Sequence, residues 1–316
     1  MFSCYLWRKL RSKNFKRNIL RIICLVIFFF INYDIISKDS VSYQSKKNIY
    51  KLLVAEGVVL GGIISYLNYE WYSDKQRVPF HFYNDFKGWN QVDKIGHFYA
   101  SYIQSNIGYS ILKKNKISEK KSLLYGGFQG LILETPIEIF DAYYKGWGFS
   151  LSDMVANAFG SLFFIAQQKL FDNQIIKPKM SFSRTIYAKN ANGYLGKNNL
   201  FSEFAYDYNG HTYWFSFSPN KLFNFKKLPK WINLSFGYGA NGMIGEFENK
   251  KFFRGNPIPE FKRYKQIYLS LDIDFSQIKS KTKFGKKVFD ILSYIKIPLP
   301  TLEFSNKKLK GHLFYF

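Results

Sequence analysis

Carboxylates and one imidazole recur at helical spacing in the middle of this 316-residue chain, and such side chains can bind a metal ion or transfer protons. An α-helix turns 100° per residue, so residues three or four positions apart share a face. Three expected helices each carry one polar stripe of this kind. The stripes consist of Asp93 with His97, Glu134 with Glu138 and Asp141, and Asp153 with Asn157.

Gathered into one site, these groups suggest metal-dependent hydrolysis. Imidazole and carboxylates suit Zn²⁺, Mn²⁺ or Mg²⁺, and a carboxylate beside His97 would raise its basicity and fix its tautomer. The candidate catalytic residues are His97, Glu138 and Asp153, acting on a lipid, glycan or phosphate ester through metal-activated water. However, the sequence lacks His-Glu-x-x-His or any comparably dense ligand motif. We therefore assign no cofactor, and a divalent metal stays an alternative.

The interpretation that we favour is a buried hydrogen-bond network that joins the helices. Asn90 and Ser150 each precede an aspartate by three residues, which suits an N-cap with an acid in the first turn. Asp93 would then hold His97 one turn later, and the acids of the second helix would accept hydrogen bonds from Trp147 and loop amides. The predicted network consists of Asp93, His97, Glu134, Glu138, Asp141, Trp147, Ser150, Asp153 and Asn157.

The order of these motifs resembles that of a known family. The segments are 93–97 (DKIGH), 136–141 (PIEIFD), 147–150 (WGFS) and 156–160 (ANAFG). Their combination is similar to the YfiM-like family of predicted periplasmic or lipoprotein-type envelope proteins, a domain of unknown function, over about a quarter of the chain. A further similarity is to the VanZ-like membrane proteins. The resemblance implies an envelope location and a helical domain, and it implies no reaction.

The N-terminus predicts export. Its first 21 residues hold seven basic and no acidic side chains, and an apolar run of ten residues, Ile22 to Ile31, follows. Ten residues fall short of the roughly 20 that span a bilayer but suit the core of a signal peptide, which needs about 7 to 15. Residues 1–37 are therefore a signal peptide or an N-terminal membrane anchor. We expect a location in the periplasm or outer membrane of a Gram-negative envelope.

The two cysteines, Cys4 and Cys24, both lie in this leader. No small residue precedes Cys24, which argues against a lipobox. The rest of the chain therefore holds no disulfide and no thiolate metal site.

The composition is basic and aromatic. The net charge is +24, and Phe, Tyr and Trp make up 20% of the residues. A basic surface favours nucleic acid, anionic lipid or other anionic polymers, and export makes nucleic acid the least suitable of these. We expect a membrane lipid surface or an envelope polymer as partner, and no nucleic acid. The sequence identifies no protein partner.

The hydrophobic period divides the chain. Helices are predicted at about 52–69, 92–112, 122–144 and 151–171, and Pro136 should kink or break the third. After Gln174 the period changes from about 3.6 to 2. The strands expected there are 201–208 and 211–218, joined in a hairpin by Asn209-Gly210, then 232–240, 266–275, 299–304 and 312–316, with a basic helix near 284–294. His211 and His312 are expected to be ordinary surface or interface residues.

The fold class is therefore α+β, with an N-terminal bundle of about four apolar helices followed by a C-terminal antiparallel β-sheet or small open barrel. The domains are the leader (1–37), a helical YfiM-like domain (38–175) and a β-rich domain (176–316). The later strands have one apolar side, which points either inward or toward lipid. We predict a membrane-associated, exported cell-envelope protein with a structural or binding role, and a metal-dependent hydrolase is the alternative.

Overall fold

The computed structural model describes residues 75–196, 198–223 and 228–315, together with seven isolated positions before residue 75. The predicted leader, residues 1–37, lies outside the described residues. Most of the predicted helix 52–69 lies outside them as well. The predicted α+β class is confirmed in the described part, where helices precede an antiparallel sheet.

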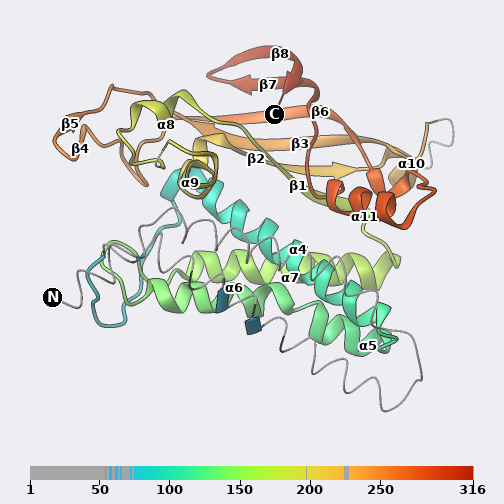
Figure 1. Cartoon of the computed structure of the whole chain (residues 1–316). Coiled ribbons are helices and arrows are strands. Elements are labelled where there is room, and N and C mark those ends of the chain that lie inside the picture. The colour runs from blue at the N-terminus through green and yellow to red at the C-terminus, as the bar shows by residue number, and fades with distance from the viewer. Residues whose placement is uncertain are drawn as a thin grey trace.

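The helices form one layer and the sheet another (Figure 1). Three long helices make up the helical layer: α4 (Val92–Lys114), α6 (Gln129–Asp141) and α7 (Leu151–Phe171). The one-turn α5 (Glu119–Lys121) lies between α4 and α6. Within the described ranges, no helix has both the length and the apolar character that crossing a bilayer requires.

Small and polar residues, not a continuous apolar surface, join the three helices. A Cβ at Gly160 would lie 2.3 Å from the Phe98 carbonyl oxygen, and one at Gly130 would lie 2.0 Å from the Ser101 oxygen. Ser101 Oγ donates a hydrogen bond to the Asn157 carbonyl oxygen at 2.6 Å. The prediction of apolar helices was therefore wrong, because close backbone contact lets short polar side chains bond across the interface.

The predicted helix 122–144 is divided, but not at Pro136. A π-helical turn, η4 (Ser122–Gly126), precedes α6, and α6 continues through Pro136 to Asp141. A Cβ at Gly126 would lie 2.4 Å from the Tyr109 backbone nitrogen. The change of helix type therefore lies where the chain packs closely against α4.

The main sheet is antiparallel and has six strands in the order β1-β2-β3-β6-β7-β8. A separate two-stranded sheet pairs β4 (Phe252–Phe253) with β5 (Asn256–Pro257). The six strands are β1 (Ile176–Phe182), β2 (His211–Phe217), β3 (Ile232–Asn241), β6 (Tyr264–Ile273), β7 (Leu299–Ser305) and β8 (Lys308–Tyr315).

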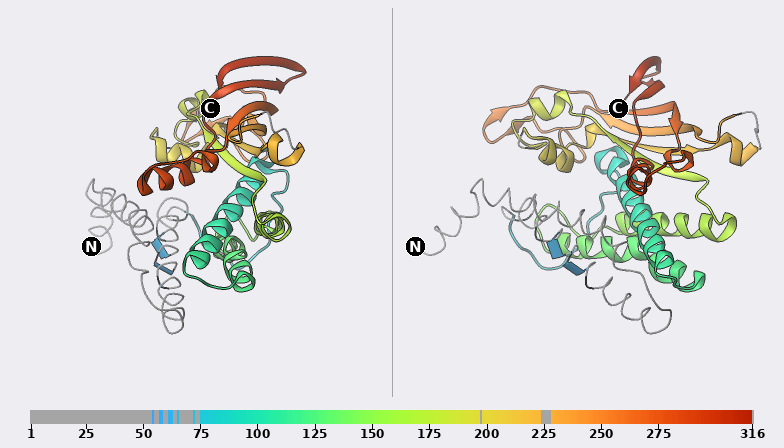
Figure 2. Two further views of the ribbon diagram at one scale, coloured as in Figure 1. Left: turned by 90° about the vertical axis from the view of Figure 1, so that its right-hand side faces the viewer. Right: turned by 45° about the vertical axis from the view of Figure 1, so that its right-hand side comes forward.

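The sheet curls, so the end of its last strand, β8, contacts its second strand, β2. Tyr315 of β8 lies with its ring centroid 4.5 Å from that of Tyr268 and 6.0 Å from that of Trp214 in β2. Three strands separate β8 from β2 in the sheet order, so only a curved sheet allows this contact. Figure 2 shows the β7–β8 hairpin standing away from the rest of the sheet.

The predicted hairpin 201–218 was wrong in its first half. Residues Leu200–Tyr206 form helix α9, and Tyr208–Gly210 form a 3₁₀ turn, η5, before β2. Asn199 Oδ1 caps α9 by accepting a hydrogen bond from the Ser202 amide at 3.0 Å. Since β2 pairs with β1 on one side and β3 on the other, a hairpin with 201–208 is not needed to satisfy its backbone.

Short helices complete the chain, and one of them matches the predicted basic helix. Helix α11 covers residues Lys283–Leu292, where 284–294 was predicted. The others are α8 (Ile186–Asn190), α10 (Pro219–Phe223) and the 3₁₀ turn η6 (Phe275–Gln277).

The start of α4 is held against the sheet. Val92 is fully buried and packs with Tyr213, Ala240 and Met243. Further along α4, the Phe98 ring lies 5.6 Å from that of Phe215 in β2. These contacts fix the first turns of α4, on the sheet side of the helical layer, against the sheet.

Candidate functional site

The polar stripes of α4, α6 and α7 meet in one cluster between the helices. The α4 side chains face acids that α6 and α7 contribute, and a loop residue, Asp85, joins them. Only Asp85, Asp93 and His97 keep modest exposure, and the others are buried. We call this set the ion cluster, and its members are Asp85, Asp93, Lys94, His97, Glu134, Glu138 and Asp153.

Lys94 lies at the centre of three aspartates. Its Nζ is 2.7 Å from Asp85 Oδ2, 2.8 Å from Asp93 Oδ2 and 2.7 Å from Asp153 Oδ1. An ammonium group has three N–H donors, so these three contacts use all of them. Burial lowers the pKa of Lys94, but Asp93, Asp153 and Asp85 outweigh burial and raise it above its ordinary value. Lys94 is therefore charged.

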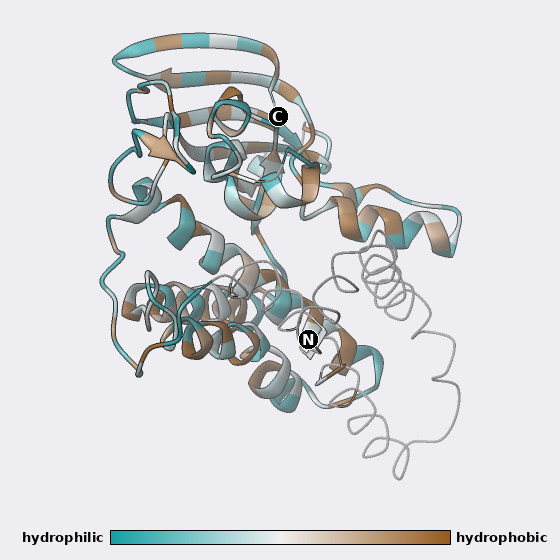
Figure 3. Ribbon diagram, turned by 60° about the vertical axis from the view of Figure 1, so that its left-hand side comes forward, coloured by the Kyte–Doolittle hydropathy of each residue, from teal (hydrophilic) through white to brown (hydrophobic). Residues whose placement is uncertain are grey.

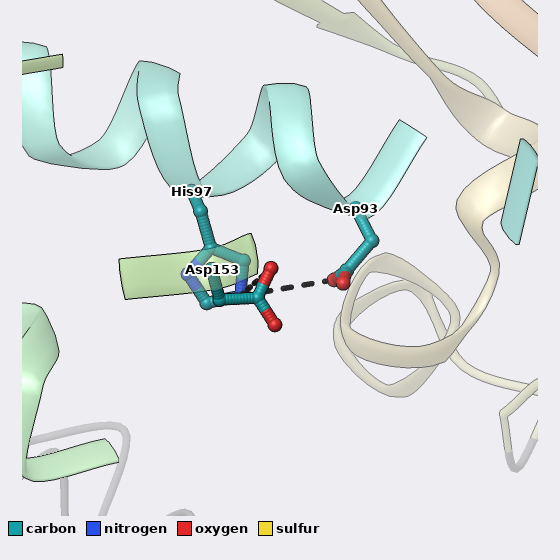
Figure 4. Close-up of side chains that lie close together, drawn as sticks. All are labelled: Asp93, His97 and Asp153. Carbon is teal, nitrogen blue, oxygen red and sulfur yellow. Dashed lines mark ion pairs between the residues drawn. The ribbon is translucent and has the colours of Figure 1, made fainter. Parts of the chain in front are cut away.

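His97 lies between two pairs of acids. Its Nε2 is 3.8 Å from Asp93 Oδ1 and 3.7 Å from Asp153 Oδ1, as the ion pairs in Figure 4 show. On the other side, Nδ1 is 3.7 Å from Glu138 Oε1 and 4.0 Å from Glu134 Oε2. Nδ1 also lies 3.3 Å from Asn157 Oδ1, at hydrogen-bond distance. Each ring nitrogen thus faces its own set of oxygens.

Burial and the neighbouring charges shift these pKa values apart. Burial lowers the pKa of His97, but Asp153, Asp93 and the glutamates raise it to about 9. Burial raises the pKa of Glu138 to about 9, although His97 opposes this. For Asp93, burial is outweighed by Lys94 and His97, which lower its pKa to about 2. When no further cation is bound, protons on His97 and Glu138 therefore offset the excess negative charge of the buried carboxylates.

Hydrogen bonds hold the outer oxygens of the cluster in place. Asp85 Oδ1 accepts from Ser150 Oγ at 2.6 Å and from Ser152 Oγ at 2.7 Å, at the start of α7. The hydroxyl of Tyr208, in the turn before β2, donates to Asp93 Oδ1 at 2.7 Å. Gln104 donates to Glu134. The cluster is therefore linked to the helices, to the loop before them and to the sheet.

One of the two predicted N-caps is present. Ser150 Oγ accepts a hydrogen bond from the Asp153 amide at 3.1 Å, as predicted. Asn90 does not cap α4, because Trp89, Asn90 and Gln91 all have positive φ and Gln91 occupies the cap position without a side-chain bond. Tyr238 bonds to the Asn90 carbonyl oxygen and Lys265 to the Gln91 side chain, so contacts with the sheet stabilise this turn.

Four residues of the predicted network are not members of the ion cluster: Ser150 and Asn157 contact its members, and Asp141 and Trp147 contact other residues. Asp141 accepts a hydrogen bond from the Tyr72 hydroxyl at 2.5 Å. The Trp147 ring packs edge-on against the Tyr72 ring at 5.3 Å, and its carbonyl oxygen lies 2.6 Å from His81 Nε2. Glu138 accepts a hydrogen bond from the Ser150 amide at 3.4 Å, which links α6 to the start of α7.

Sequence reasoning missed three members or supports of the cluster: Asp85, Lys94 and Tyr208. Lys94 stands inside the DKIGH segment between Asp93 and Ile95, and it was not part of the polar stripe formed by Asp93 and His97. Lysine is rarely buried unless it is paired, so its place one residue after Asp93 was the available signal. Asp85 and Tyr208 lie in loops, where periodicity gives no information about direction.

Within the described residues, three cluster members could hold a metal ion. One ligand atom each from Asp93, His97 and Asp153 lies within 4.8 Å of the others. Glu134 and Glu138 face the opposite nitrogen of the imidazole and would orient the ring. This arrangement can bind a cation, and it also serves as a structural ion-pair cluster.

Comparison with known proteins supports the family resemblance. Residues 82–168 match the family model described as "Predicted periplasmic lipoprotein (DUF2279)", which is the YfiM-like family. This segment contains the whole ion cluster. The similarity to VanZ-like membrane proteins is not supported. No curated protein and no solved structure matches the chain significantly.

Proposed function

We propose, from the family match of residues 82–168 and from the surface of the sheet, that this protein is an exported envelope protein that binds a membrane surface. The family description agrees with the predicted export to the periplasm. The outer membrane is the proposed site of attachment. The helical layer then acts as a scaffold, and the ion cluster stabilises it.

The observation that carries this proposal is the exposed apolar side of β3, β6 and β7. In β6 the polar residues Gln266, Ser270 and Asp272 are buried, whereas Ile267 and Leu269 are exposed. The same inverted pattern holds in the two neighbouring strands. We call the exposed set the apolar sheet face, and its members are Phe236, Ile267, Leu269, Leu271, Leu302 and Phe304.

These six side chains form one continuous surface. Leu269 is paired with Phe236 on one side and with Leu302 on the other, and Ile267 is paired with Phe304. Figure 3 shows apolar and polar residues alternating along the strands of the sheet. Exposed apolar patches of this kind mark contact with protein or membrane. On this same side of the sheet Tyr213 and Phe215 of β2 pack against α4, whereas the apolar side chains of β3, β6 and β7 stay exposed and can contact a partner.

The rim of this face has the charge that favours an anionic membrane. Lys265 lies near the start of β6, two residues before Ile267, Lys307 lies in the turn between β7 and β8, and Lys308 begins β8. All three lysines are exposed. A lysine near an anionic leaflet contributes about 1 kcal/mol, and salt screens the attraction. The apolar centre and basic rim together fit a lipid surface with anionic headgroups.

Vesicle sedimentation tests this proposal. The full chain should bind vesicles containing phosphatidylglycerol more strongly than pure phosphatidylcholine, and added salt should weaken the binding. Leu269→Ser with Phe304→Ser should reduce binding at least tenfold, because both side chains are exposed and contribute apolar area only on contact. Leu170→Ser, at an exposed apolar position on α7, is the matched control and should bind normally.

The proposal would be contradicted by vesicle binding that is independent of lipid charge and of salt concentration and that the double variant retains in full. Self-association through the same face, abolished by the same double variant without any lipid, would identify a second copy of the chain as its partner instead.

A metal-dependent hydrolase is the second candidate, and the meeting of Asp93, His97 and Asp153 is the observation that favours it. Such an enzyme would act on an envelope lipid, glycan or phosphate ester. Its test is cleavage of a chromogenic phosphodiester by the wild type with added Mn²⁺. Asp153→Asn should abolish the activity if this carboxylate takes part, and equal activity in this variant would exclude the cluster as the catalyst.

A further inference from the structure

The geometry points to a binding site for one divalent transition-metal ion between Asp93, His97 and Asp153. The His97 Nε2 atom is 3.8 Å from Asp93 Oδ1 and 3.7 Å from Asp153 Oδ1. Zn²⁺ binds nitrogen and oxygen at about 2.0–2.2 Å, which places the ligand atoms of a tetrahedral site roughly 3.3–3.6 Å apart. The observed separations from Nε2 exceed this range by only tenths of an ångström.

The orientation of the imidazole is a second, independent observation. Metal-binding histidines usually donate a hydrogen bond from the second ring nitrogen to a carboxylate or carbonyl oxygen. Here Nδ1 faces Asn157 Oδ1 at 3.3 Å and Glu138 Oε1 at 3.7 Å. A proton on Nδ1 leaves the Nε2 lone pair directed at the two aspartates, as a ligand requires.

The Asn157 side chain adds to this. It is completely buried against the ring, and its Nδ2 has no hydrogen-bond partner among the described residues. A buried amide donor normally finds an acceptor. The contact that the structure shows for this amide is with Nδ1, so Asn157 orients the imidazole ring.

The charges on this side of the ring call for a divalent cation. Asp85, Asp93 and Asp153 face one ammonium, that of Lys94, which leaves two negative charges, and without a metal only the cationic form of His97 offsets one of them. All three donors of Lys94 are already used, and it cannot neutralise more. Buried charges without partners are costly, and a divalent ion would balance these two.

The ligand set selects among ions. One imidazole and two carboxylates suit Zn²⁺ or Mn²⁺ better than Ca²⁺, which prefers six to eight oxygen ligands. Access is available because the side chains of His97 and Asp93 are 18% and 14% exposed. The site does not depend on membrane binding by the sheet, so either proposal can fail without the other. It would supply the metal that the hydrolase candidate requires.

Calorimetric titration of Zn²⁺, Mn²⁺, Mg²⁺ and Ca²⁺ tests this inference. The protein is the full chain without a histidine tag, with Cys4→Ser and Cys24→Ser to remove thiolate ligands, and it is treated first with a chelator. We expect one Zn²⁺ or Mn²⁺ per chain and a matching rise in melting temperature, because binding to the native state alone stabilises it. His97→Gln and Asp153→Asn should weaken binding at least tenfold.

His312→Gln is the matched control, because its Nε2 pairs with Glu303 at 2.9 Å on the sheet, away from the cluster. Its metal affinity should equal that of the parent. Absence of binding by the parent protein at millimolar metal overturns the inference, whether or not the variants fold. Unchanged affinity in a folded His97→Gln protein, shown by circular dichroism, overturns it equally.

Discussion

Lys94→Met is expected to lower the free energy of unfolding by about 3–5 kcal/mol, since it leaves three buried or half-buried carboxylates without their shared cation. Methionine has a similar length and fills the same space, so the loss comes from charge and not from a cavity. Lys94 is within 2.8 Å of all three partners and is itself only 8% exposed. Chemical denaturation at pH 7 measures the effect.

The control is Lys113→Met. Lys113 forms an ion pair with Glu119 at the same distance, 2.8 Å, but both side chains are well exposed. Exposed pairs contribute only about 0–1 kcal/mol, so this variant should be nearly as stable as the wild type. Equal losses in the two variants would show that burial of the ion cluster adds nothing to stability. Loss in Lys94→Met alone would establish the cluster as a structural element.

Acid is expected to destabilise the wild type more than His211→Gln. His211 is buried, and its Nε2 lies 2.9 Å from the Phe204 carbonyl oxygen. Burial lowers its pKa to about 4, against an ordinary value of 6.5. Between these two pH values the unfolded chain binds a proton that the native protein does not, so stability falls as pH falls from 6.5 to 4.

The size of this effect follows from the shift. Each pKa unit corresponds to about 1.4 kcal/mol, so the His211 contribution should be about 3 kcal/mol over that interval. Melting curves of the wild type and His211→Gln at several pH values measure the difference, and the stability gap between them should narrow toward pH 4. Glutamine keeps a donor for the Phe204 oxygen. Parallel pH profiles would mean that His211 accepts a proton without cost in the native protein.

Several parts of the fold follow from local sequence. The α4 and α7 spans were predicted within a few residues because apolar and polar residues recur at helical spacing over five or more turns. The alternating strands β3 and β6 were equally clear. Ser150 capped α7 as expected, since a cap depends only on residues within one turn.

Other features were not predicted, one because a local cap was missed and one because of tertiary burial. Residues 201–208 have a strand-like composition, yet Asn199 caps a helix there and Asp207 binds the Asn209 side chain. His211 was expected to be a surface or interface residue, but it is buried, and its ring nitrogens contact Tyr213 of β2 and Phe204 of α9. The first miss was of a local signal, the Asn199 cap, and the second came from burial of His211 by the folded chain.

Sequence alone thus established the polar stripes of the helices and the one-sided strands. It could not determine the partner of each stripe, because periodicity fixes a face but not what that face contacts. Tertiary packing brought Asp85 from a loop to Lys94 and placed Asp153 beside His97. It also decided that the polar side of β6 is buried and the apolar side exposed, because the curled sheet encloses the polar side, where Tyr268 meets Tyr315.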